Sequence, residues 1–358
     1  MDKVRFAIVG CGSVSGNIYF PNIGNLPDGE LAAVCDADRA RAESRAAEFH
    51  VPYYLGVDEL LEREKFDLLV NLTNVPNHFG VSLKALKAGR HVYTQKPMTT
   101  TVEEATALIG EAEQRNLIIV SEHSEPIRPI GRTIKKLVEG GVIGKIYWAR
   151  ITCTHWGPAT IDNWPTDPEW FYQRGAGPLR DVGVERIGTL IDFMGPVKRV
   201  SAMSGVNLPE VIVRGGPNKG KAIRVTEDDV TLLTMDFGEN CFAMLDSAWV
   251  QHRATRTPLL EIYGHKGVIS LSNNEEQLEL FRDEPELGIR GWTDVKLIPS
   301  VDQDQSGRAI GLAHALDCVL RGKKPILSGE RARHCTEVIE KAYLAARTGT
   351  TQDVETTF

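Results

Sequence analysis

Short apolar runs alternate with amphipathic stretches from residue 1 to about residue 122. A short apolar run bounded by turn residues is typical of a buried strand, and strands separated by helical patterns form parallel sheets with right-handed crossovers. The pattern therefore predicts a doubly wound parallel sheet. The predicted strands are 4–9, 30–36, 66–72, 90–94 and 117–121, and the predicted helices are 37–50, 58–65, 78–88 and 102–115.

The pattern changes at about residue 125. Strand-like segments now follow one another directly, and Gly238-Glu239-Asn240 and His265-Lys266-Gly267 are hairpin signals between them. This order predicts a mostly antiparallel sheet in an α+β domain, so we expect domains over 1–124 and 125–358. The predicted strands are 145–154, 197–203, 230–237, 241–249, 259–263, 267–271 and 278–281, with helices at 130–139, 305–321 and 330–347.

A glycine turn follows the first predicted strand. Gly10 permits a tight turn, and Gly12 lets the backbone approach a pyrophosphate, whose charge the next helix would face with its N-terminal amides. Ser15 stands at the third glycine of this dinucleotide fingerprint. The alternative is a glycine-rich turn of any α/β protein.

An acidic residue ends the second predicted strand. Asp36 lies 24 residues after Gly12, near the spacing of the acid that binds the adenosine ribose. Its charge would repel the 2′-phosphate of NADP and favour NAD, while the nearby Arg39 keeps NADP as an alternative. Asp36 could also serve as the N-cap of the following helix.

Composition excludes several classes of protein. The 358 residues carry a net charge of −7 without a basic block, so nucleic acid is not an expected partner. The six cysteines lack metal-ligand spacing, so we expect reduced thiols, no metal and a cytoplasmic protein. No signal peptide is expected before the first strand, and no apolar run reaches the ~18–20 residues of a membrane span.

Lys96 follows a predicted strand and precedes Pro97. Ligands of a doubly wound sheet bind at the carboxyl ends of its strands, so Thr73, Asn74, Lys96 and Glu122 should gather beside the glycine turn. A partly desolvated lysine next to a nicotinamide can exchange the proton of a substrate hydroxyl. The alternative is a solvated surface lysine.

Two carboxylates stand four residues apart in the segment 175–186. If a helix starts near Gly183, Asp181 and Glu185 share a face, and the repulsion between two close acids suits acid–base chemistry. Alternatively, Asp181 is an N-cap and Glu185 pairs with Arg186 or Arg180.

Three of the six tryptophans lie between His155 and Arg174. Aromatic faces combined with polar side chains suit a sugar, and His155 is a further candidate there. The alternative is that these tryptophans plug a domain interface.

Together these motifs resemble the Gfo/Idh/MocA oxidoreductases, the glucose–fructose oxidoreductase and inositol dehydrogenase group. The resemblance rests on Gly10-Cys11-Gly12, on 85–92 leading into Gln95-Lys96-Pro97, on the junction 140–146, and on 175–185. It covers nearly the whole chain. It departs at Gln95, where the family usually has Glu, at Glu185, where it has His or Tyr, and at Gly188, an often acidic position.

The resemblance implies a Rossmann domain, a large open-faced second sheet, last helices that pack back on the first domain, and a homo-oligomer, dimer or tetramer. Lys96 would be the catalytic lysine, Asp181 a substrate-orienting acid, and Glu185 a further acid–base group. The expected NAD-binding residues are Gly10, Gly12, Ser13, Val14, Asp36, Arg39, Thr73, Asn74, His78, Gln95 and Lys96. The expected substrate-binding residues are Lys96, Glu122, His155, Trp164, Tyr172, Arg174, Asp181 and Glu185.

The main functional hypothesis is an NAD(P)-dependent dehydrogenase acting on a hydroxyl-bearing carbon of a sugar, polyol or glycoside. A second hypothesis keeps the cofactor but cleaves a glycoside by transient oxidation, elimination and re-reduction. A third is a non-catalytic regulator that binds NAD and a sugar.

Overall fold

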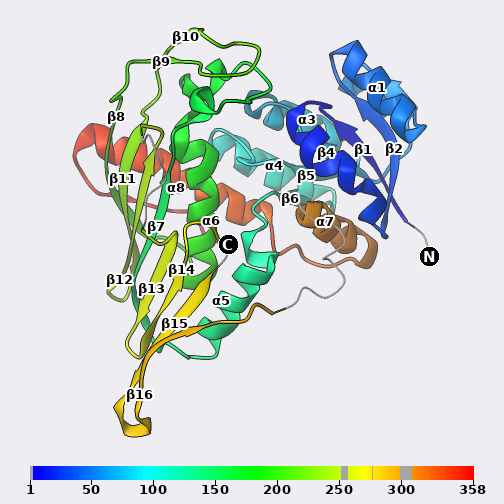
Figure 1. The fold of residues 1–358 in the computed structure, drawn as a ribbon. Coiled ribbons are helices and arrows are strands. Elements are labelled where there is room, and N and C mark those ends of the chain that lie inside the picture. The colour runs from blue at the N-terminus through cyan, green and yellow to red at the C-terminus, as the bar shows by residue number, and fades with distance from the viewer. Residues whose placement is uncertain (1–2, 251–256, 276, 299–308) are drawn as a thin grey trace. The chain divides into compact units, whose positions relative to one another are not determined.

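The computed structural model describes residues 3–250, 257–275, 277–298 and 309–358. They form two compact units (Figure 1). Residues 305–308 of the helix predicted over 305–321 lie outside the described residues. One unit comprises Met1–Ile127 with Ser300–Thr336, and the other comprises Arg128–Pro299 with Glu337–Phe358.

A six-stranded sheet in the order β3-β2-β1-β4-β5-β6 forms the centre of the first unit, and all its pairings are parallel. The predicted doubly wound sheet is therefore confirmed. Both faces are covered, so Phe6 and Ile8 of β1 enter one core while Ala7 and Val9 enter the other. The strands are β1 (Val4–Val9), β2 (Gly29–Cys35), β3 (Tyr53–Tyr54), β4 (Leu68–Asn71), β5 (His91–Thr94) and β6 (Ile119–Ser121).

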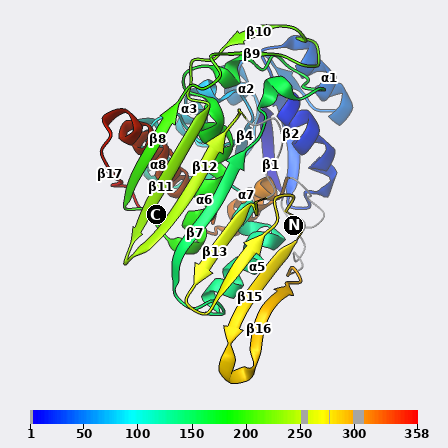
Figure 2. The ribbon, with the colours of Figure 1, turned by 60° about the vertical axis from the view of Figure 1, so that its left-hand side comes forward.

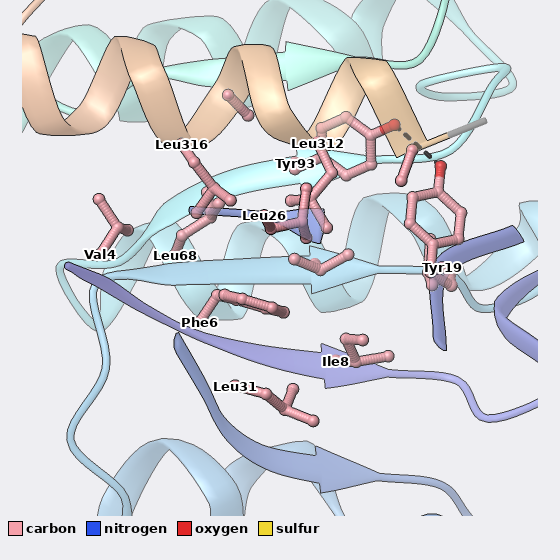
Figure 3. Packing of buried hydrophobic residues seen from close by; sticks show 14 of the residues in the cluster. Val4, Phe6, Ile8, Tyr19, Leu26, Leu31, Leu68, Tyr93, Leu312 and Leu316 are labelled. Carbon is pink, nitrogen blue, oxygen red and sulfur yellow. Dashed lines mark hydrogen bonds between the residues drawn. The ribbon is translucent and has the colours of Figure 1, made fainter. Parts of the chain in front are cut away.

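Helices cover the two faces of this sheet. Figure 3 shows one core, in which Leu312 and Leu316 of α7 pack over Phe6 and Leu68 of the sheet. The other core lies beneath α2, α3 and α4. The helices of this unit are α1 (Arg39–Phe49), α2 (Val57–Arg63), α3 (Val75–Lys87), α4 (Val102–Gln114) and α7 (Ile310–Arg321), and α8 (Gly329–Thr348) begins in it.

The segment after the glycine turn differs from the expected regular helix. Ser15–Tyr19 is a π-helical turn and Phe20–Asn25 is a 3₁₀-helix. Pro21 in the second turn has no N–H to continue a regular ladder. Buried Ser15 closes the first turn by donating its hydroxyl to the Gly12 carbonyl at 2.9 Å. The helical turns therefore begin directly after the glycine turn, but they do not form a regular α-helix.

The second unit contains a nine-stranded sheet in the order β16-β15-β14-β13-β7-β12-β11-β8-β17. Its pairings are antiparallel except that between β7 and β12, so the predicted mostly antiparallel sheet is confirmed. The strands are β7 (Ile146–Thr154), β8 (Arg199–Gly205), β11 (Val230–Gly238), β12 (Cys241–Ala248), β13 (Leu260–Gly264), β14 (Gly267–Leu271), β15 (Leu278–Glu284), β16 (Ile289–Asp294) and β17 (Gln352–Asp353), with a separate pair β9 (Glu210–Ile212) and β10 (Ala222–Arg224).

Helix α5 (Pro129–Glu139) packs on α6 (Val184–Met194), which packs on β7 and β12. Figure 2 shows the strands of this sheet in front of the two helices. On β8, β11 and β12, the side chains of Met203, Leu232 and Phe242 are 77%, 53% and 47% exposed. The sheet therefore has a buried face and an exposed face with large apolar side chains.

All six cysteines are free thiols. Among the described helices, none is both long enough and apolar enough to cross a bilayer.

The C-terminal segment is fixed by a buried carboxylate. Glu337 of α8 is 4% exposed and accepts hydrogen bonds from the backbone N–H groups of Glu355 (2.8 Å) and Thr356 (2.7 Å). Burial by itself would raise the pKa of Glu337, but the hydrogen bonds from Thr356 and Glu355 outweigh it and lower the pKa below its usual 4.5. This acid therefore stabilises the fold in its charged form.

We predict that Glu337→Gln lowers the free energy of unfolding at neutral pH by about 1–3 kcal/mol. The folded pKa is depressed, so the contribution of the carboxylate is present above pH 4.5 and is lost as the pH falls through the folded value. Urea unfolding at several pH values should show a flatter acid limb for the variant. Parallel curves for the two proteins would contradict this.

Candidate active site

A cavity of about 420 Å³ lies at the carboxyl ends of β1, β2 and β4 in the first unit. In a doubly wound sheet, the chain winds in one direction on one side of the first strand and in the opposite direction on its other side. Ligands of such sheets bind at the carboxyl edge beside this strand, which is β1 here. Its lining residues include Gly10, Gly12, Asp36, Ala37, Asp38, Arg41, Leu72, Thr73, Asn74 and Asn77.

The two glycines of the turn have different structural roles. Gly10 has φ +101°, and a Cβ there would lie 2.6 Å from the carbonyl oxygen of Leu72. Around Gly12, a Cβ would meet only the Arg41 guanidinium, at 3.9 Å. Gly10 is therefore required by the fold, whereas Gly12 leaves open space in the cavity. Of the expected neighbours, Ser13 accepts from the Asn17 amide at 3.1 Å, and Val14 is 43% exposed.

Asp36 turns back towards the glycine turn. Its carboxylate accepts hydrogen bonds from the N–H groups of Cys11 (2.7 Å) and Asp38 (2.8 Å). The N-cap of α1 is Asp38, which accepts from the Arg41 N–H at 3.2 Å, so the alternative of Asp36 as N-cap is wrong. The physical reason is that the Cys11 N–H points at the end of β2, where it binds the carboxylate of Asp36.

Arg39 does not line the cavity. Its guanidinium donates to Glu43 (3.3 Å) and to the Tyr53 hydroxyl (3.2 Å). Arg41 lines the cavity instead and pairs with Asp38 at 3.3 Å. Both arginines follow the acid closely in sequence, and only the first turn of α1 decides which one faces the cavity.

Thr73 and Asn74 line the cavity. His78 is buried and does not line it. His78 Nδ1 lies 2.8 Å from the carbonyl oxygen of Pro97, and Nε2 lies 2.9 Å from that of Thr73. Burial lowers the pKa of His78, while the carbonyl groups of Pro97 and Thr73 act in the opposite direction. His78 thus connects the cavity wall to the residue after Lys96.

Lys96 is half-buried between β5 and Pro97. In the same unit Gln95 donates its amide to the Tyr19 hydroxyl, and Glu122, 8% exposed, accepts from the Tyr93 hydroxyl. Burial, together with the charges of Lys96 and Arg331, lowers the pKa of His123 to about 3. A neutral imidazole therefore lies near the lysine.

In the second unit, Asp181 lies inside a π-helical turn, Leu179–Gly183, and Glu185 lies in the first turn of α6. The N-cap positions of the turn and of α6 are Pro178 and Gly183, so Asp181 does not stand at an N-cap. Burial raises the pKa of the Cys153 thiol to about 12. Asp181 and Glu185 also raise this pKa, whereas the charge of Arg186 lowers it. Both carboxylates therefore lie near the carboxyl end of β7. Arg186 pairs with Glu275 at 3.3 Å.

The residues of the aromatic segment 155–174 range from a buried core to the exposed surface. His155 follows β7, and its ring nitrogens lie 3.0 Å from the Gly157 N–H and 2.9 Å from the Trp249 indole N–H. Tyr172 is 2% exposed in a core with Trp249, and its hydroxyl accepts from the Ala159 N–H at 2.9 Å. Trp164 meets Phe171 edge-on at 5.3 Å, and Arg174 is exposed.

Two family models match the chain. One, described as an oxidoreductase family with an NAD-binding Rossmann fold, matches residues 4–123, and the Gfo/Idh/MocA C-terminal domain matches residues 132–270.

The chain belongs to the Gfo/Idh/MocA oxidoreductase family.

Relatives of this oxidoreductase act on sugars according to their names. A dTDP-3,4-didehydro-2,6-dideoxy-alpha-D-glucose 3-reductase of Saccharopolyspora spinosa is 30% identical over 56% of this chain and 59% of its own length. D-apiose dehydrogenase of Paraburkholderia graminis is 22% identical over 99% of this chain and 90% of its own. The crystal structure of aldose-aldose oxidoreductase from Caulobacter crescentus, at 21% identity, superposes with a TM-score of 0.79 over 98% and 99% of the two chains.

The cavity of this family member fits the cofactor. The open space at Gly12 and the carboxylate of Asp36 in the cavity lining are features that a dinucleotide requires. Arg41 was not expected, and the N-cap motif at Asp38 was the sequence signal that would have placed it on the first turn of α1.

We predict that Gly12→Ala keeps the unfolding temperature of the wild type but weakens NAD binding at least about tenfold, because the methyl group enters the cavity and not the protein core. Gly10→Ala is the matched contrast and should impair folding, because its Cβ meets the Leu72 carbonyl. Calorimetric titration with NAD and thermal unfolding measure the two effects. Unchanged NAD affinity in the Gly12 variant would contradict the placement.

Proposed function

We propose that this NAD-dependent oxidoreductase transfers hydride between nicotinamide and a hydroxyl-bearing carbon of a sugar, polyol or glycoside. The observation that carries the proposal is the position of Lys96. This lysine is half-buried at the end of β5, in the same sheet that holds the cofactor cavity at the carboxyl end of β1. The names of the 3-reductase and of D-apiose dehydrogenase support a sugar substrate. We assign the cofactor function to 1–124 and substrate binding to 125–358.

In the proposed reaction, Lys96 takes the proton of the substrate hydroxyl during oxidation and returns it during reduction. Asp181 and Glu185 bind the neighbouring hydroxyls through their carboxylates and orient the reacting carbon. Bound NAD supplies the hydride acceptor. Glu185 adds a negative charge where related proteins usually carry a histidine or tyrosine, so this site favours a neutral sugar over an acidic one.

Asp36 supports NAD as the preferred form of the cofactor. Its carboxylate is held at the cavity by the N–H groups of Cys11 and Asp38, and a 2′-phosphate would meet this fixed negative charge. Arg41 is engaged with Asp38. The free cysteines support a cytoplasmic location.

We further propose that the exposed face of the nine-stranded sheet binds a second copy of this chain. Met203 lies opposite Leu232 in the β8–β11 pairing, and Phe242 lies opposite Trp148 in the β7–β12 pairing, so two pairs of large apolar side chains lie on this sheet. A hollow of about 430 Å³ beside Trp148 and Phe242 could receive a side chain of the partner. Exposed apolar patches of this kind are typical of interfaces.

We predict that Lys96→Met lowers kcat for the best substrate by about 10²–10⁴-fold, because the proton then lacks an acceptor. NADH absorbance would be followed with a panel of sugars, inositols and aryl glycosides, each with NAD and with NADP. Lys84→Met is the control, because Lys84 only pairs with Asp58 at 2.7 Å on the surface of the first unit. NAD-dependent substrate loss without net NADH would replace this function by oxidation and elimination.

We predict that Leu232→Glu dissociates the oligomer, because a buried carboxylate in an apolar interface has no partner. Light scattering after size-exclusion chromatography measures the mass. Leu287→Glu is the control, because Leu287 is 69% exposed in a surface turn of the β15–β16 hairpin. A wild-type monomer, or equal effects of both substitutions, would refute the proposed interface.

A further inference from the structure

A chain of hydrogen bonds runs through the core of the first unit from Gln95 to Glu122. The Gln95 amide nitrogen donates to the Tyr19 hydroxyl, the hydroxyls of Tyr19 and Tyr93 lie 2.8 Å apart, and the Tyr93 hydroxyl donates to the Glu122 carboxyl group. Tyr19, Tyr93 and Glu122 are 1%, 0% and 8% exposed. Figure 3 shows the two hydroxyls facing each other beneath α7.

The number of hydroxyl hydrogens determines the donor-to-acceptor direction of these hydrogen bonds. Each tyrosine has one hydroxyl hydrogen. Tyr93 gives its hydrogen to Glu122, so Tyr19 must donate to Tyr93. The Tyr19 oxygen then accepts from Gln95, whose amide nitrogen is a donor. All three bonds therefore point from Gln95 towards Glu122, and bonds aligned in this way strengthen one another.

The acidic end of the chain is sealed. Glu122 donates its backbone N–H to the Thr94 carbonyl at 2.9 Å, which joins it to the end of β5. Gly311 of α7 lies so close that a Cβ there would be 2.0 Å from Glu122 Oε2 and 2.8 Å from the Tyr93 hydroxyl. The backbone of α7 thus packs directly against the carboxyl group of Glu122.

The other end of the chain holds the residue before Lys96. The Gln95 N–H also donates to the Asn71 carbonyl at 3.0 Å. On the far side of the lysine, the Pro97 carbonyl lies 2.8 Å from His78 Nδ1. The backbone of Lys96 is therefore held on both sides by buried polar contacts.

We propose that Gln95, Tyr19, Tyr93 and Glu122 are positioning residues that fix Lys96 for proton transfer, and that this series of hydrogen bonds requires a donor at position 95. The proposal rests on the role of Lys96 in the proposed function. A glutamate at 95 would accept from Tyr19 while Glu122 accepts from Tyr93. The two hydroxyl oxygens, 2.8 Å apart, would then face each other without a hydrogen between them.

The same reasoning identifies a rescue. In Gln95→Glu combined with Glu122→Gln, the amide at 122 donates to Tyr93, Tyr93 donates to Tyr19, and Tyr19 donates to the carboxylate at 95. The three hydrogen bonds between these four residues are then restored with their direction reversed. Glu122→Gln alone keeps the original direction, because its amide oxygen can still accept from Tyr93.

The experiment measures kcat, KM for NAD and the unfolding temperature of the two single variants, the double variant and the wild type. Gln95→Glu should lower kcat about tenfold or more with little change in KM for NAD, because a displaced catalytic group affects the chemical step more than cofactor binding. Glu122→Gln should have a smaller effect. The double variant should recover to within about threefold of the wild type, although it carries one more substitution than Gln95→Glu.

Gln114→Glu at the exposed end of α4 is the control for the chemical change and should behave as the wild type. The proposal is overturned if Gln95→Glu retains the wild-type kcat, or if the double variant is no better than Gln95→Glu in both kcat and unfolding temperature. A wild-type kcat in Lys96→Met would overturn the role of the lysine in the proposed function. The unfolding temperatures of the Gln95 and Glu122 variants would still determine the direction of the hydrogen bonds between these residues.

Discussion

The cofactor site depends on the parallel pairing of β1 with β2 on one side and β4 on the other. This pairing brings three strand ends to one edge, where Gly10 lies against the carbonyl of Leu72 and the Cys11 N–H reaches Asp36. Because the approach at Gly10 leaves no space for a Cβ, the turn is packed directly against the β4 loop, and the Cys11 N–H ties it to the Asp36 carboxylate. The cavity is therefore a consequence of sheet topology as much as of the glycine sequence.

Buried polar contacts supply the precision that an apolar core cannot. His78 connects the carbonyl groups of Thr73 and Pro97, and the hydrogen bonds from Gln95 to Glu122 connect the end of β5 with the start of the chain. Such groups are costly to bury without partners, so they allow one arrangement only. Lys96 lies between these two connections, which relates its proposed chemistry to the core of the first unit.

The two units meet different physical demands. The parallel sheet of the first unit is covered on both faces, so apolar residues of β1 such as Phe6 and Ala7 are buried on both sides of the strand. In the second unit the strands alternate buried and exposed residues, as in the burial pattern of β11. The π-helical turns at 15–19 and 179–183 follow the two glycine motifs, and such turns are frequent at functional sites because they change the direction of side chains within a helix.

The sequence by itself determined the two sheets, because alternating and continuous apolar patterns directly reflect one-sided and two-sided burial. It also identified Gly10, Gly12 and Asp36, whose spacing is that of a dinucleotide-binding strand–helix–strand unit. The short strands β3, β9, β10 and β17 were missed, since two or three residues show no period, and the more exposed β16 lacks a regular one. Only the tertiary structure selected Arg41 over Arg39, placed Tyr172 in a core, and gave Gln95 and Glu122 their partners Tyr19 and Tyr93. Those assignments depend on contacts between residues far apart in the chain, which local sequence patterns do not encode.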